Sequence, residues 1–271
     1  MRRLIKFISV FLFIVAAYQT HAVTKRHPTM ILLHGALFTS DVWLPVQTHL
    51  QNDGYNVITV DTPGRLYDGV KPKDATLTAA VTKLCKVVDI QPEPVLLVGH
   101  NQAGAIITQA IAHCGKNIKG LVYLAAVVPW PGEQPFDVLN DQDNCNFDLA
   151  APLDNKSGLS IPGSFSMIKS LFMPDADDNQ AKNAVRNMVA EPIIFAYEAL
   201  QYDMTAFKAM PKYYIKTTKD LIVSPESQEA FLKRQEMTRV FTLESSHTPF
   251  ISQPEKLAQL FAEINDLETA S

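Results

Sequence analysis

Residues 95–110 have the sequence VLLVGHNQAGAIITQA, and this stretch decides the fold. It begins with a short apolar run of the kind that forms a buried strand. Gly99 and Gly104 bracket a polar turn, and the small apolar residues that follow predict a helix. A strand that turns sharply into a helix holds the residue at the tip of the turn at one edge of a sheet. Here that residue is Asn101.

Short β-branched or leucine-rich runs alternate with helical segments on both sides of this stretch. Such alternation is typical of βα units around a parallel sheet. The predicted strands are residues 30–34, 56–60, 95–98, 118–124, 212–216 and 239–243, and the clearest helices are residues 76–88, 103–113, 225–236 and 254–267. The sequence therefore predicts an α/β fold with a mostly parallel, twisted sheet flanked by helices.

The alternation stops between residues 127 and 210. This stretch is rich in proline and contains the apolar segments FSMIKSLFM and EPIIFAYEAL, which we expect to form short helices. So many large apolar side chains would be costly to leave in water, which argues against a wandering surface loop. An insertion here predicts a helical cap over the ends of the strands, where open α/β sheets bind ligands.

The first 22 residues have the pattern of a secretory signal peptide. Arg2, Arg3 and Lys6 precede an apolar run over residues 7–17, and small residues end the segment at Ala22. The alternative is a membrane anchor, but the apolar run is shorter than the roughly 18 to 20 residues that a spanning helix needs. We therefore expect cleavage after Ala22, export to the periplasm or the exterior, and no stable membrane anchor after cleavage.

The charge and composition limit the partners. The chain has 24 Lys and Arg against 28 Asp and Glu, and removal of the three N-terminal cations would change the net charge from -4 to -7. An acidic protein with 47% hydrophobic residues is neither disordered nor suited to nucleic acid. Because no metal-ligand spacing and no glycine-rich phosphate loop occurs in the sequence, we expect no metal and no cofactor. The oligomeric state is not predicted.

The chain contains three cysteines, Cys85, Cys114 and Cys145, with no C-x-x-C spacing. In an exported protein one pair would be expected to form a disulfide. Cys85 and Cys114 are the pair to test, because both fall on helices flanking the same predicted strand. The alternative is three buried thiols.

Two polar residues follow later strands of the predicted sheet. Asp220 comes after the strand in KYYIKTTKD, and His247 lies in LESSHTPF after the next strand. Both are expected at the same edge of the sheet as Asn101, with the carboxylate of Asp220 orienting the imidazole of His247. The chain order of turn residue, acid and histidine is that of a hydrolase built around a G-x-S-x-G nucleophile turn.

An earlier glycine supplies a further part of this site. The predicted strand at residues 30–34 ends in His34-Gly35-Ala36, and a glycine lets the chain turn so that the amide of Ala36 faces the site. The amide of Gln102 follows the turn residue on the other side. Two converging N–H groups of this kind predict an oxyanion hole. Further candidates for the pocket are His34, Gly35, His100 and Trp130.

The motifs HGALFTSDVW, GYNVITVDTPGR, VLLVGHNQAG, LVYLAAVVP and HTPFISQPEKLA resemble those of the α/β-hydrolase superfamily over residues 23–271. Within it they look like the branch of methylesterases, hydroxynitrile lyases and small bacterial esterases. The resemblance implies that His247 is the base, Asp220 its orienting acid, and Ala36 and Gln102 the oxyanion amides. The family's serine nucleophile maps to Asn101. Thr248 stands where the lyases have a lysine, which favours an esterase lineage.

A carboxamide at position 101 has no proton that an imidazole can remove to make a good nucleophile, so no acyl-enzyme is expected. Four hypotheses follow for a small ester-like molecule as substrate or ligand. His247 activates water directly for weak or atypical ester hydrolysis; or the protein binds its ligand without turnover, as a pseudoenzyme; or Asn101 deamidates to a carboxylate nucleophile; or the site performs lyase chemistry. The sequence favours a hydrolase of esterase ancestry, and it does not identify the substrate.

Overall fold

The computed structural model describes residues 27–65 and 68–270. Six parallel strands form one sheet in the order β2-β1-β3-β4-β8-β9. The strands are β1 (Met30–Leu33), β2 (Val57–Val60), β3 (Val95–His100), β4 (Ile118–Leu124), β8 (Lys212–Thr217) and β9 (Arg239–Leu243). The predicted fold class is confirmed, and each predicted strand is found to within one or two residues. The predicted signal peptide and its cleavage point lie outside the described residues.

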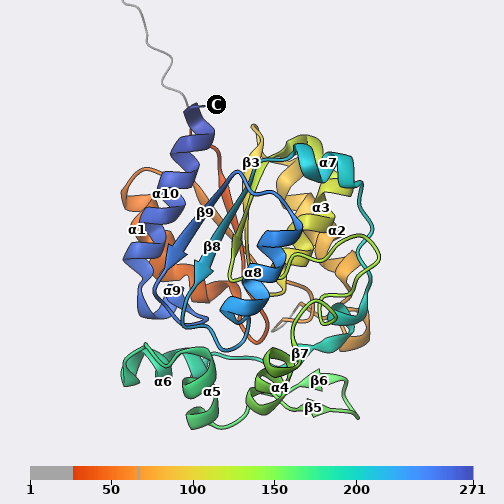
Figure 1. The fold of residues 1–271 in the computed structure, drawn as a ribbon, viewed down its shortest axis with the longest axis vertical. Helices are drawn as coiled ribbons and strands as arrows, with labels where there is room; N and C mark the ends of the chain where they lie inside the picture. The colour runs from red at the N-terminus through yellow and green to blue at the C-terminus, as the bar shows by residue number, and fades with distance from the viewer. Residues whose placement is uncertain (1–26, 66–67, 271) are drawn as a thin grey trace, which may run out of the picture.

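Helices flank both faces of this sheet. They are α1 (Leu44–Asn52), α2 (Leu77–Asp89), α3 (Ala103–Cys114), α8 (Pro225–Arg234), α9 (Pro249–Ser252) and α10 (Pro254–Ala270). In Figure 1, α1 and α10 lie together on one side of the sheet and α2 and α3 on the other. Short 3-10 turns are η1 (Ser40–Trp43), η2 (Pro72–Asp74) and η3 (Gly115–Asn117). Side chains of Thr76 and Ser224 cap α2 and α8, which fixes where these helices begin.

The central strand β3 and the helix after it are almost completely buried. All six residues of β3 are buried, as are ten of the twelve residues of α3. Close approach of α3 to the chain after β4 requires Gly104, because a Cβ atom there would lie 2.2 Å from the carbonyl oxygen of Val127. The turn between β3 and α3 is therefore held by packing on both sides.

The chain between β4 and β8 forms a separate layer. Its elements are α4 (Asp141–Ala150), β5 (Leu153–Asp154), β6 (Leu159–Ser160), α5 (Phe165–Phe172), α6 (Asp178–Arg186), β7 (Glu191–Pro192), η4 (Ile193–Tyr197) and α7 (Met204–Ala209). The strands β5, β6 and β7 make a small antiparallel sheet. In Figure 1, α4–α6 and β5–β7 lie together beyond the carboxyl ends of the large sheet, and we call them the cap layer. By contrast, α7 lies beside α3.

The two apolar segments of this region differ in structure. FSMIKSLFM forms α5, as expected. EPIIFAYEAL does not form an α-helix, because Glu191 and Pro192 pair with β6 as a strand and only a 3-10 turn follows. Pairing with a neighbouring strand has thus overridden the local apolar pattern.

A disulfide between Cys85 and Cys114 joins α2 to α3, with 5.7 Å between the two Cα atoms. This is the pair expected from the sequence. Cys145 is a free, exposed thiol, so the alternative of three buried thiols is wrong. Within residues 27–65 and 68–270, no helix is long and apolar enough to cross a membrane.

Candidate active site

Asn101 occupies the tip of the turn between β3 and α3 in a left-handed conformation, with φ of +55°. Asparagine tolerates this region better than most residues other than glycine. Its backbone N–H donates to the carbonyl of Leu124 (3.3 Å), and its carbonyl accepts from the amides of Gly104 and Val127 (both 3.1 Å). Gly99 is required in the turn, because a Cβ there would lie 2.7 Å from the carbonyl oxygen of Ala103. The turn has the shape of a nucleophile elbow with an amide at its tip.

His247 and Asp220 form a buried pair. The Nδ1 atom of His247 donates to Oδ2 of Asp220 at 2.8 Å, and both side chains are at most 1% exposed. Asp220 also accepts hydrogen bonds from the hydroxyl of Thr217 (2.9 Å) and from the amides of Ile222 (2.8 Å) and Val223 (2.9 Å). Because Nδ1 of the neutral ring carries the proton, Nε2 has the free lone pair and can accept one. This is the arrangement of a general base with an orienting acid.

His100 connects this pair to the elbow. Its ring lies 4.4 Å from the ring of His247, and its Nε2 atom donates to the carbonyl of His247 at 2.9 Å. Burial, and next the neighbouring His247, hold the pKa of His100 well below its ordinary value, so the ring is neutral. A Cβ on Gly35 would lie 2.5 Å from Nδ1 of His100, which explains the glycine. His100, which directly precedes the tip of the turn, thus links the turn to His247.

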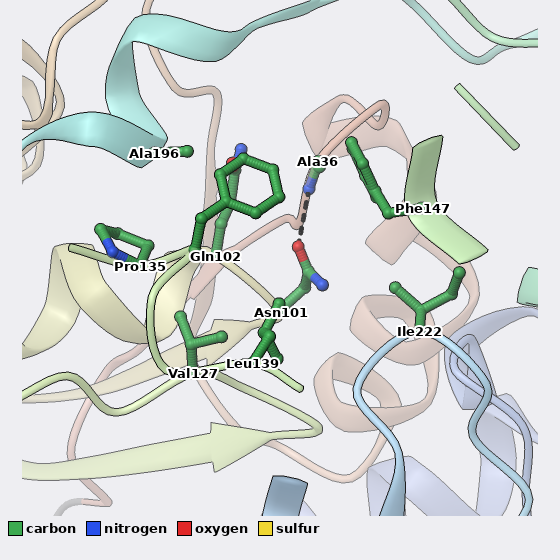
Figure 2. A pocket seen from close by; sticks show the side chains of 10 residues that line it. Ala36, Asn101, Gln102, Val127, Pro135, Leu139, Phe147, Ala196 and Ile222 are labelled. Atoms are coloured by element: carbon green, nitrogen blue, oxygen red, sulfur yellow. Dashed lines mark hydrogen bonds between the residues drawn. The ribbon is translucent and has the colours of Figure 1, made fainter. Parts of the chain in front are cut away.

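The two predicted oxyanion residues flank Asn101. The amide of Ala36 donates to Oδ1 of Asn101 at 3.4 Å, and Gln102 stands at the N-cap position of α3 without a side-chain capping bond. Figure 2 shows the carboxamide of Asn101 with its oxygen toward the amide of Ala36 and its nitrogen on the side of Ile222. The side-chain carbonyl of Asn101 therefore takes the donor that an oxyanion would use.

A pocket opens over these residues (Figure 2), with a volume of about 390 Å³ including its mouth. It is lined by Ala36, Asn101, Gln102, Val127, Pro135, Phe136, Leu139, Phe147, Ala196 and Ile222. Asn101 and Gln102 are the polar side chains in this lining. An apolar pocket with a few convergent polar groups is the usual form of a small-molecule site.

Four predicted pocket residues, His34, Gly35, His100 and Trp130, do not line this pocket. Gly35 and His100 pack beneath the elbow. The ring of His100 instead packs against those of Trp43, His247 and Phe250. Trp130 lies at the surface, where its ring stacks under the guanidinium of Arg234 at 4.4 Å.

His34 is a structural histidine. It is fully buried, its Nδ1 atom donates to the carbonyl of Gly35 at 2.8 Å, and its Nε2 atom accepts from the amide of Thr62 at 3.1 Å. Burial, and next the positive charge of Arg65, lower its pKa to about 4. A neutral ring with both nitrogens bonded fixes the end of β1 against the chain after β2.

Sequence reasoning missed two acidic residues next to the site. Glu191 of β7 is 4% exposed and accepts hydrogen bonds from Arg65 and from the side chain of Gln102. Asp175, between α5 and α6, accepts from the amide of Ser246 at 3.0 Å and from nearby serine hydroxyls, namely those of Ser245, Ser246 and Ser252. Neither residue belongs to a local motif, so only the folded chain reveals these contacts.

The missed pocket residues lie in the same part of the chain. Phe136, Leu139 and Phe147 come from the segment after β4, where the sequence gives only an apolar composition. Among the described residues, no cluster of three or more His, Cys, Asp and Glu side chains is arranged to hold a metal ion.

The fold and the site define a hydrolase-type α/β protein, and comparison with known proteins gives the family. The profile of the Alpha/beta hydrolase family matches residues 30–260, so the chain belongs to this family. Its relatives include putative methylesterase 15, chloroplastic, of Arabidopsis thaliana, which is 27% identical over 259 residues. That alignment covers 91% of this chain and 58% of the relative, so the chain spans little more than half of that protein's length.

A second relative is similar in length to this chain. The pyrethroid hydrolase of Sphingobium wenxiniae is 27% identical over 248 residues, which cover 88% of this chain and 87% of the relative. The predicted resemblance to methylesterases is thus confirmed, and the relatives of this chain include methylesterases and a pyrethroid hydrolase.

Solved structures agree on the fold. The crystal structure of a pyrethroid hydrolase from Sphingobium faniae JZ-2 superimposes with a TM-score of 0.79 at 24% identity, covering 88% of this chain and 97% of that one. An extracellular α/β-hydrolase from a Paenibacillus species gives a TM-score of 0.75 at 20% identity, covering 87% and 98% of the two chains.

Proposed function

We propose that this protein hydrolyses a small, mostly apolar ester and that His247 activates water directly. The observation that carries the proposal is the buried Asp220–His247 pair, which is joined to the lining of the apolar pocket by the amide of Ile222. Asn101, which also lines this pocket, cannot form an acyl-enzyme. Esterase-type relatives support the reaction class.

The chemistry requires one water and one ester. Nε2 of His247 removes a proton from water as the oxygen bonds to the ester carbonyl carbon, and the charge that develops on the carbonyl oxygen meets the amides of Ala36 and Gln102. The bond to the alkoxy oxygen then breaks, and the proton on His247 passes to the departing alcohol. Before this, the carboxamide of Asn101 must rotate away from the Ala36 amide, and its N–H group can then hold the substrate.

The pocket lining favours a neutral substrate. Its walls are apolar and include Phe136, Phe147 and Ala196, and no charged side chain lines it within the part of the chain that the structure describes. A carboxylate would therefore lose its hydration without gaining a cation. We accordingly propose that the site takes up a neutral ester and releases the acid product. We also propose that the predicted insertion at residues 127–210 acts as the cap that shapes this preference.

Hydrolysis of p-nitrophenyl acetate and butyrate by the purified protein, beside the His247→Ala variant, tests this function. Wild type should release p-nitrophenol above the background rate, and His247→Ala should not. Equal rates for the two proteins would refute hydrolysis by His247.

A second candidate function is binding without turnover. The specific observation in its favour is the hydrogen bond from the amide of Ala36 to Asn101, which occupies a donor that catalysis needs. Calorimetric binding of a neutral ester at 1:1 stoichiometry, with the ester recovered unchanged after hours, would support it. Product formation that depends on His247 would exclude it.

We also propose that the protein is exported. The N-terminal pattern of cations and apolar residues supports this, and so does the disulfide, since disulfides persist in oxidising compartments. Expression of the full chain in a bacterial host and mass analysis of the exported fraction tests it. A mature protein beginning at Val23 is expected, and an uncleaved chain confined to the cytosol would contradict the proposal.

A further inference from the structure

We propose that Glu191 is a positioning residue that sets the oxyanion hole from the cap layer. This inference rests on the proposed function, because it concerns the same site. Glu191 does not line the pocket and lies in a different layer from the elbow. Its carboxylate nevertheless accepts hydrogen bonds from the amide of Leu37, which follows Ala36, and from the side chain of Gln102, which follows Asn101.

The first contact is with the loop after β1. The amide of Leu37 donates to Oε2 of Glu191 at 2.8 Å, and the carbonyl of Leu37 accepts from the amide of Val189 at 2.9 Å. Leu37 has φ of +68°, a conformation that costs free energy and persists only when neighbours hold it. Residues 189 and 191 thus fix both backbone polar groups of Leu37, and the amide of Ala36 belongs to the preceding residue.

The second contact is with the elbow. The Nε2 atom of Gln102 donates to Oε1 of Glu191 at 2.8 Å. The same residue supplies the other expected oxyanion amide through its backbone. One carboxylate therefore ties Gln102 to Leu37, the residue after Ala36. The amides of Ala36 and Gln102 must converge on one point, and small displacements of such donors cost catalysis heavily.

The carboxylate is in turn fixed by Arg65. The two groups form a buried ion pair, with side chains 6% and 1% exposed, and the Nε atom of Arg65 donates to the carbonyl of Phe38 at 3.1 Å. A buried pair is a poor source of net stability, but loss of one partner leaves the other charge without compensation. These contacts indicate that the Arg65–Glu191 pair fixes the loop after β1 against the elbow.

Glu191→Gln is the test, and Glu198→Gln is the matched control. Glu198 also joins the segment before β8 to the body of the fold, since it accepts from the amide of Thr78 in α2 at 3.2 Å, but this contact does not involve the loop after β1. The test compares kcat and KM for p-nitrophenyl butyrate between the two variants, each made in the wild-type and in the Asn101→Ser background. Glu191→Gln should lower kcat at least about tenfold with KM changed less than twofold, and Glu198→Gln should change neither by more than twofold. Equal effects of the two variants on kcat would overturn the inference.

Hydrogen exchange separates this inference from the proposed function. In the wild-type background, the amides of Ala36 and Leu37 should exchange at least tenfold faster in Glu191→Gln than in Glu198→Gln. If no background hydrolyses esters but this acceleration is seen, the hydrolase proposal fails and the positioning role stands. Unchanged exchange of both amides would refute the positioning role whatever the activity. If Glu191→Gln does not fold because Arg65 is left unpaired, the double variant Arg65→Met/Glu191→Gln takes its place in both measurements.

Discussion

The amide of Ala36 and the side chain of Asn101 are hydrogen-bonded to each other, with 3.4 Å between the amide nitrogen and Oδ1. In a serine hydrolase the same amide would be free to meet the substrate's carbonyl oxygen. Here Asn101 has no hydroxyl that could attack, and it is bonded to the amide that we propose for the oxyanion hole. An asparagine at this turn therefore differs from the serine of such a hydrolase in two ways.

Replacing Asn101 with serine should reverse both effects. The hydroxyl would lie near a base that is already oriented, and the amide of Ala36 would be released. We expect kcat/KM for p-nitrophenyl esters to rise by at least about 100-fold, since loss of a serine nucleophile costs far more than that in a well-studied protease. Asn101→Ala is the control, because it frees Ala36 but supplies no nucleophile. Equal activity of the two variants would show that a serine at 101 cannot be activated here.

Asp220→Asn should reduce activity in the Asn101→Ser background by about 10³-fold or more. The amide can present an N–H group to His247 and so favour the wrong tautomer of the ring. The side chain keeps its size and can still accept from the amides of Ile222 and Val223, so the fold should survive. Steady-state kinetics with thermal unfolding as a control checks this. A loss of less than tenfold would mean that Asp220 does not orient the base.

The buried histidines should make folding stability sensitive to mild acid. The pKa of His34 is about 4 in the folded protein and 6.5 in its ordinary state, because burial and next Arg65 disfavour the charged ring. Between pH 6.5 and pH 4 the unfolded chain therefore binds a proton at His34 that the folded protein does not bind. The free energy of unfolding accordingly decreases as the pH falls from 6.5 toward 4. From pH 7.5 to pH 5 this loss is about 2 kcal/mol for His34 alone.

Urea unfolding at the two pH values measures that loss. The His34→Asn variant keeps a donor for the carbonyl of Gly35 but does not titrate in this range, so its pH dependence should be smaller than that of wild type. His100 remains in the variant and continues to contribute in the same direction. An identical loss in wild type and His34→Asn would contradict the assignment.

Reduction of the disulfide should destabilise the packing of α2 against α3. Cys85 and Cys114 are 29 residues apart in sequence, and closing a loop of that length stabilises the folded state by about 3 to 4 kcal/mol in the chain-entropy view. The double variant Cys85→Ala/Cys114→Ala should therefore unfold at a clearly lower temperature. Cys145→Ser, which alters an exposed thiol, should leave the midpoint unchanged. Equal midpoints for the two proteins would contradict a stabilising disulfide.

The strands and the elbow could be predicted because their signals are local. A short apolar run bounded by turn residues identifies β3, and the glycines around Asn101 leave little choice of conformation. Asp220 and His247 could be paired in advance because parallel strands end at the same edge. Chain order and strand ends carry that information without any knowledge of the packing.

The rest depends on contacts between distant parts of the chain. Arg65 and Glu191 are 126 residues apart, and nothing in either local sequence indicates the other. Trp130 is a large aromatic residue of the kind that often lines pockets, but its ring lies at the surface against Arg234. The strand at Glu191 exists because β6 pairs with it, which no apolar pattern reveals.

The cap layer is bonded to both halves of the site. Asp175 holds the amide of Ser246, next to His247, and Glu191 holds the amide of Leu37, next to Ala36. A swinging motion of this layer would break both contacts and expose a buried ion pair. Such a motion is therefore disfavoured, and we expect the cap layer to set the width of the opening through which molecules reach Asn101.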